Sequence, residues 1–235
     1  MMNQLRVEFY KLTRFIGVYL LMAFQAGVGV SYGYDILSKS GIGVTSTNMI
    51  FQTVIGDTST MIIIFSVIAW FLGKDFSTRT IQNEIRIGYS RESIFISRSL
   101  ITFFTIILMH FIWIVFSLLG FILKRGIDVS FLQFTNFIWL ITVSLQVMAI
   151  ASAVIMIEFF AKNASMAIII NIIIVFIGCN IMRNIVDMQI YQITCFGLAQ
   201  SDSWKVLLPA IICAIVTILA FGLITCVRFR KAEIK

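Results

Sequence analysis

The run SLITFFTIILMHFIWIVFSLLGFIL, residues 99–123, decides the fold class of this chain. It contains no Asp, Glu, Lys or Arg, and a membrane-spanning helix needs about 20 predominantly apolar residues. The whole chain has the same character, with 60% hydrophobic and only 12% charged residues in 235, against about 25% charged in an ordinary soluble domain. A soluble fold of this size cannot hide so much apolar surface, so we expect an all-α integral membrane protein.

Five further apolar runs flank this one along the chain. They lie at about 15–34, 54–73, 134–158, 164–182 and 206–227. With 99–123 they predict a single transmembrane domain over residues 1–235, built from six spans. The segment before the first span mixes charged residues with apolar ones and shows no small-residue cleavage site, so we expect an interfacial helix over 1–14 and no cleaved signal peptide.

The distribution of Lys and Arg predicts the orientation of the spans. Cytoplasmic segments of membrane proteins carry an excess of Lys and Arg. With the N-terminus inside, thirteen of the 18 basic residues fall on the cytoplasmic side and five outside. The five outside are Lys39, Lys124, Arg125, Arg183 and Lys205. We therefore expect both termini in the cytoplasm.

The three outer segments differ in composition. Residues 35–53 are polar and contain Gly41 and Gly43, which is typical of a loop, and 124–130 are short enough for a tight turn. Residues 183–205 alternate apolar and polar side chains. This segment is too polar to cross a membrane and too apolar to be a fully solvated loop. For this last segment we expect an ordered amphipathic or re-entrant structure at the outer leaflet.

Several classes of protein are disfavoured by the motifs that the chain lacks. Gly73-Lys74 is followed by Asp75 and has no Gly five positions earlier, so it is not a P-loop. The four Cys show no CxxC spacing and there is one His, so we expect no metal site and no cofactor in this chain. The net charge of +7 resides at the ends of apolar runs, which argues against nucleic acid as a partner. Gly29 and Gly33 have the spacing of closely packed membrane helices.

Among the polar side chains inside predicted spans are His110, Gln146 and Asn171. A polar group in lipid is costly, so each should face protein or a cavity. Hydrogen bonds between helices are the interpretation we favour. A role along a substrate path is the alternative.

The segment between the second and third spans, 74–98, is the most charged part of the chain. Ile81 and Ile85 are four residues apart and so share one helix face, and Asp75 and Arg79 have the same spacing and can pair. Gly88 is placed to end this helix, and Ser90 to cap the next, with Glu92 in its first turn. We expect a short helix, a Gly turn and a second helix leading into the third span, forming a docking surface rather than a passive loop.

This segment resembles the one that follows span two in type-2 ABC permeases, the membrane subunits of bacterial ABC exporters. That family typically has an acidic residue, a short helix opening with Gly-Thr or Arg-Thr, a Gly, then Ser-Arg, and a basic residue entering span three. The corresponding positions here are Asp75, Arg79-Thr80, Gly88, Ser90-Arg91 and Arg98. The chain departs from the commonest pattern in having Arg79 where Gly is frequent. The stretch 83–91 looks most like small permeases that export peptide antibiotics or confer immunity to them.

The resemblance implies a transport subunit, not an enzyme. Two copies of a separate ATPase, which bind ATP and Mg, would act with this chain and a second permease chain, identical or homologous, among membrane lipids. The residues implied in docking the ATPase are Asp75, Arg79, Thr80, Ile81, Glu84, Ile85, Gly88, Ser90 and Arg91. The substrate would be hydrophobic or amphipathic, such as an antimicrobial peptide or a lipid-like compound. The alternatives are a membrane subunit of another complex, a single-chain carrier, or an intramembrane enzyme.

Overall fold

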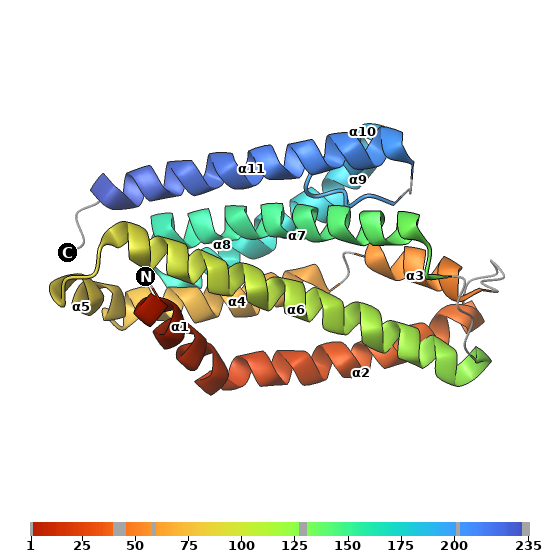
Figure 1. The fold of residues 1–235 in the computed structure, drawn as a ribbon, viewed down its shortest axis with the longest axis horizontal. Helices are drawn as coiled ribbons and strands as arrows, with labels where there is room; N and C mark the ends of the chain where they lie inside the picture. Colours follow the sequence, from red (N-terminus) through yellow and green to blue (C-terminus); the bar gives the residue numbers. More distant parts are fainter. Residues whose placement is uncertain (1, 40–45, 58–59, 127–130, 201–202, 232–235) are drawn as a thin grey trace.

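The chain forms a bundle of long antiparallel helices (Figure 1). The computed structural model describes residues 2–39, 46–57, 60–126, 131–200 and 203–231, and within these ranges it contains helices and no strand. Four helices are long and apolar enough to cross a membrane: α2 (Ile16–Lys39), α6 (Arg91–Arg125), α7 (Phe134–Ala161) and α11 (Trp204–Lys231). The chain is thus an all-α protein with the composition and helix lengths of a membrane protein.

Two further apolar helices are shorter than the spans expected from the sequence. α4 (Met61–Ser77) packs against α8 (Ala164–Phe176), which continues as a π-helix over Ile177–Ile181. The expected span 54–73 is interrupted because α3 (Thr47–Ile55) ends at Gly56 before α4 begins. α3 also makes part of the expected loop 35–53 helical, and Ser46 caps it by accepting a hydrogen bond from the Met49 amide.

Close contact between α2 and α6 depends on glycines from both helices. A Cβ atom placed at Gly33 would overlap the carbonyl group of Ser117, and one placed at Gly120 would overlap the carbonyl group of Val30. Gly29 also lies against Ser117. The predicted packing role of the Gly29–Gly33 pair is therefore confirmed, since small residues allow backbones to approach closely.

Different short helices lie at the two ends of the bundle. α1 (Met2–Arg14), α5 (Thr80–Arg86) and the last turn of α11 lie at one end (Figure 1). α3, α9 (Met182–Ile185) and α10 (Met188–Ile193) lie towards the other. α1 and the end of α11 share one end of the bundle, as an even number of membrane crossings would produce.

The segment before α11 is tied firmly to α7. The Gln146 side chain donates to the carbonyl oxygens of Gln192 (2.9 Å) and Thr194 (2.8 Å) and accepts from the Ala199 amide at 2.7 Å. The Trp139 indole donates to the Ala199 carbonyl at 2.5 Å. The described part of 183–205 thus contains two short helices and is hydrogen-bonded to α7, whereas its expected place at the outer leaflet stays a prediction. Of the expected turn 124–130, α6 covers the start through Arg125, and 127–130 lie outside the described residues.

Candidate functional site

The segment between α4 and α6 is bent sharply at one residue. Arg79 adopts φ 59° and ψ 18°, in the left-handed region, so the helix cannot continue through it. α5 therefore leaves the direction of α4 at 54°. This conformation also explains why a Gly suits the position, since Gly reaches it without steric cost. The predicted pair of Asp75 with Arg79 is absent from the ion pairs of the described residues, because the four-residue spacing applies only within an unbroken helix.

Asp75 instead belongs to a cluster of five charged side chains that joins four helices. Arg98 of α6 lies at the centre, with its side chain only 1% exposed. One terminal nitrogen of its guanidinium is 2.8 Å from Asp75 Oδ2 and 3.2 Å from Glu84 Oε1, and its Nε is 3.6 Å from Glu8 Oε1. We call Glu8, Lys11, Asp75, Glu84 and Arg98 the ion cluster.

Lys11 of α1 supplies the second cation of the ion cluster. Its Nζ lies 2.8 Å from Glu8, 2.9 Å from Glu84 and 3.4 Å from Asp75. Every acidic member therefore lies near both cations, and every cation near all three acids. The ion cluster fixes α5, through Glu84, to α1, α4 and α6.

Burial and charge act in opposite directions on the two ion-cluster groups from α1. Burial raises the pKa of Glu8 above its usual 4.5, although Arg98 and Lys11 act to lower it. Burial also acts to lower the pKa of Lys11, but the Glu8 and Asp75 carboxylates outweigh it, and this pKa is raised above 10.5. Lys11 is thus held charged, whereas ionised Glu8 is only partly compensated.

The apolar residues of α5 do not lie on an open docking surface, where the sequence led us to expect them. Ile81 is 1% exposed and belongs to the hydrophobic core, and Ile85 is partly buried against that core. Both side chains are covered by the chain itself, so Ile81 in particular is not available to a partner. Ile87, after the last turn of α5, is 77% exposed instead.

The connection from α5 to α6 follows the sequence prediction. Gly88 has φ +101° and follows the last turn of α5, a conformation that favours Gly. Ser90 caps α6 by accepting a hydrogen bond from the Ser93 amide at 3.2 Å, with Glu92 in the first turn. Arg91 donates to the carbonyl oxygens of Phe229 and Arg230, which ties the start of α6 to the end of α11.

One face of the α5 segment points away from the bundle. Arg79, Asn83, Arg86 and Ile87 are exposed, whereas Glu84 and Ile81 point inward. α5 lies at one end of the bundle, where α4 ends and α6 begins (Figure 1). We call Arg79, Asn83, Arg86 and Ile87 the outer face of α5. It carries two positive charges around one large apolar side chain.

The chain matches no protein-family model, no curated protein and no solved structure.

The three polar side chains inside the bundle have different surroundings and do not form one site. Both the amide nitrogen and the amide oxygen of the Gln146 side chain are hydrogen-bonded to the segment before α11. His110 is 2% exposed and lines a cavity of about 300 Å³ between α6 and α7. Asn171 is 1% exposed on α8, and neither it nor Gln146 lines the His110 cavity. His110 and Asn171 make no side-chain hydrogen bond within the described part of the chain.

Proposed function

We propose that this chain is the permease subunit of an ABC exporter in a bacterial plasma membrane. In this proposal α4 and α8 complete a set of six spans, and both termini are cytoplasmic. The single observation that carries the proposal is the position of α5. The ion cluster holds its inner side through Glu84 while its outer face stays open.

This arrangement suits an element that transmits force. A load applied to the outer face would pass through Glu84 and Arg98 directly into α6, which extends over 35 residues. It would also reach α1 through Lys11 and α4 through Asp75. A passive loop would not need a buried five-member ion cluster, whose desolvation is costly.

The partner in this proposal is a separate ATPase that binds ATP and Mg, present in two copies. The outer face would fit a groove on this ATPase that has an apolar pocket for Ile87 and acidic side chains near Arg79 and Arg86. A second permease chain, identical or homologous, would complete the transporter. The cargo would be a hydrophobic or amphipathic compound such as an antimicrobial peptide, moved outward.

Co-purification with an ATPase tests the proposal, and a neighbouring reading frame that encodes a P-loop ATPase would supply the candidate. We expect a stable complex in detergent and ATP hydrolysis in nanodiscs. Ile87→Asp should abolish both without lowering the yield of inserted protein, because a buried apolar residue at an interface carries much of its energy. Ile185→Asp is the matched control, since Ile185 is 75% exposed but lies on α9, towards the opposite end of the bundle.

Two outcomes would reject the proposal. In the first, the Ile87→Asp variant forms as much complex with the ATPase, and hydrolyses ATP as fast, as the Ile185→Asp control. The other is purification of a functional protein with no ATPase attached, which would favour a single-chain carrier or a subunit of another complex.

A further inference from the structure

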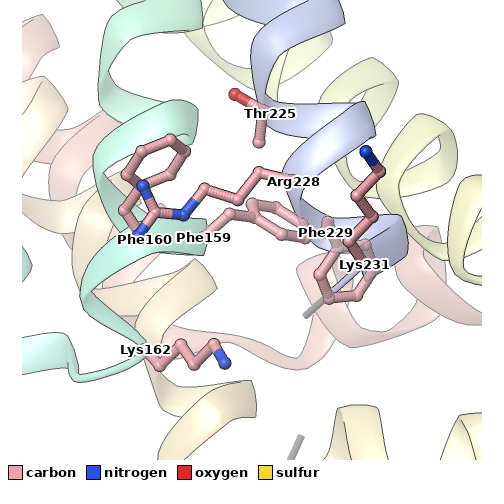
Figure 2. A pocket seen from close by; sticks show the side chains of 7 residues that line it. All are labelled: Phe159, Phe160, Lys162, Thr225, Arg228, Phe229 and Lys231. Atoms are coloured by element: carbon pink, nitrogen blue, oxygen red, sulfur yellow. The ribbon is translucent and has the colours of Figure 1, made fainter. Parts of the chain in front are cut away.

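A cavity of about 420 Å³ lies between the C-terminal ends of α7 and α11 (Figure 2). Its walls include three cations, Lys162, Arg228 and Lys231, beside the aromatic rings of Phe159 and Phe229. None of the described residues that line it is acidic. We call it the basic pocket.

The cations of the basic pocket are held at helix ends. Lys162 ends α7 with φ 50° and ψ 20°, and Lys231 is the last residue of α11. The Arg228 guanidinium carbon lies 4.0 Å from the centre of the Phe160 ring, which positions the group through a cation–π contact. Phe159 and Phe229 meet edge to face, with ring centres 4.9 Å apart, and give the pocket a rigid aromatic wall.

Two neighbouring acids are directed elsewhere. Glu158 is fully buried, and its carboxylate lies where a Cβ at Gly73 would touch it, on the side of α7 that faces α4. Glu92 is paired with Arg230, which does not line the basic pocket. Neither acid therefore supplies a charge among the groups that line the basic pocket.

An apolar groove adjoins the basic pocket. It has a volume of about 190 Å³, lies between α6, α7 and α11, and is lined by side chains such as Phe103, Ile155 and Ile218. Thr225 lines both the groove and the basic pocket. The basic pocket at the helix ends and the apolar groove beside it thus share one lining residue, Thr225.

We propose that the basic pocket binds the phosphate group of an anionic phospholipid, with an acyl chain against the adjoining groove. Basic pockets at the ends of membrane helices, where headgroups lie, are suited to anionic lipid. Arg and Lys bind phosphate strongly, Arg through parallel N–H donors. The groove selects a lipid over a soluble phosphate compound. The proposal does not depend on an ATPase partner.

Native mass spectrometry of the detergent-purified chain tests this site. The probes are phosphatidylglycerol, phosphatidylcholine and glycerol 1-phosphate. Phosphatidylglycerol should bind most tightly, and Arg228→Gln with Lys231→Gln should weaken it by about thirtyfold, the loss expected for two cations near a membrane surface. Arg230→Gln with Lys74→Gln is the matched control, since it removes two exposed cations, one from the last turn of α11 and one from the last turn of α4.

Each other outcome overturns the proposal. Equal binding of phosphatidylglycerol to the two double variants would show that only overall charge matters. If the unaltered chain bound phosphatidylcholine as tightly as phosphatidylglycerol, then the charge of the headgroup would not determine binding. Glycerol 1-phosphate binding as tightly as the lipid would assign the basic pocket to a soluble phosphate compound.

Discussion

The guanidinium of Arg98 lies 2.8 Å from the carboxylate of Asp75, although one residue is near the start of α6 and the other near the end of α4. The same nitrogen reaches Glu84 on α5 at 3.2 Å, and the Arg98 side chain is almost fully excluded from solvent. One buried cation thus determines how three helices meet at this end of the bundle. Because burying it is costly unless its partners are present, the ion cluster should be cooperative.

Removing Arg98 should therefore destabilise the protein strongly. Arg98→Ala leaves three carboxylates with Lys11 alone, and breaking a buried ion pair by deleting one partner costs about 3–5 kcal/mol. Thermal unfolding in detergent measures the loss. Arg230→Ala is the matched control, because its pair with Glu92 is 74% and 48% exposed and exposed pairs contribute about 0–1 kcal/mol. Equal melting temperatures for the two variants would contradict a central role for Arg98.

Glu8 should behave differently from the other acids of the ion cluster. Burial raises the pKa of Glu8, so protonation of Glu8 stabilises the folded state. This stabilisation is fully present below pH 4.5 and is lost as the pH rises through the folded-state pKa. Above pH 4.5 the raised pKa makes Glu8 cost stability relative to a side chain that is always neutral, so Glu8→Gln should preserve or raise the melting temperature. Melting curves between pH 4.5 and 8 should show the unaltered protein losing stability relative to Glu8→Gln as the pH rises. A constant difference would refute this account.

The sequence predicted features set by neighbouring residues and missed those set by distant ones. Gly88 and the Ser90 cap were predictable because a left-handed turn and an N-cap each depend on local backbone groups. The Asp75–Arg79 pair was wrong because the left-handed bend at Arg79 separates the two helices. The true partner of Asp75, Arg98, becomes adjacent only when α4 and α6 meet.

The exposure of the apolar face of α5 was also predicted wrongly, because it depends on residues distant in the sequence. A four-residue spacing shows that Ile81 and Ile85 share a face, but it does not show whether other helices cover that face. Here the core covers Ile81, and Ile87 is left exposed. Apolar character identified the four long helices for a complementary reason, since length and composition alone decide whether a helix can cross lipid.

Ile81 and Ile87 should consequently separate folding from docking. Ile81→Ala removes a buried side chain and should cost about 2–5 kcal/mol of stability. Ile87→Ala removes an exposed one and should leave the isolated subunit unchanged. Thermal unfolding of both variants without any partner provides the comparison. If Ile87→Ala were as destabilising as Ile81→Ala, then the outer face of α5 would be covered within the protein itself.

Gln146 should control the order of the segment before α11. Gln146→Leu removes three hydrogen bonds and leaves the Gln192 and Thr194 carbonyl oxygens and the Ala199 amide without that side chain. Buried groups that lose a partner cost about 1–3 kcal/mol each. Amide exchange over 192–200 should accelerate at least tenfold in detergent. Ser144→Ala is the control, since the Ser144 hydroxyl donates to the Leu140 carbonyl within its own helix. Unchanged exchange in Gln146→Leu would mean that Trp139 alone holds the segment.

Substitution by Ala should have different effects on stability at Gly33 and at Gly27. Gly33→Ala places a methyl group into the Ser117 carbonyl group, so α2 and α6 must move apart along their contact. A Cβ at Gly27 meets nothing within 4 Å, so Gly27→Ala should be neutral or slightly stabilising, because Ala favours a helix over Gly by up to about 1 kcal/mol. Melting temperatures in detergent should therefore fall for Gly33→Ala and hold for Gly27→Ala.

A second substitution shows whether this loss reflects the α2–α6 contact. Gly120 lies across the same contact, against Val30, so Gly120→Ala alone should also lower the melting temperature. Once Gly33→Ala has separated the helices, the added methyl group at position 120 should find space. The double variant should then lose less than the two single losses combined, the behaviour of residues that share one contact. Strict additivity would mean that the two glycines act at independent places.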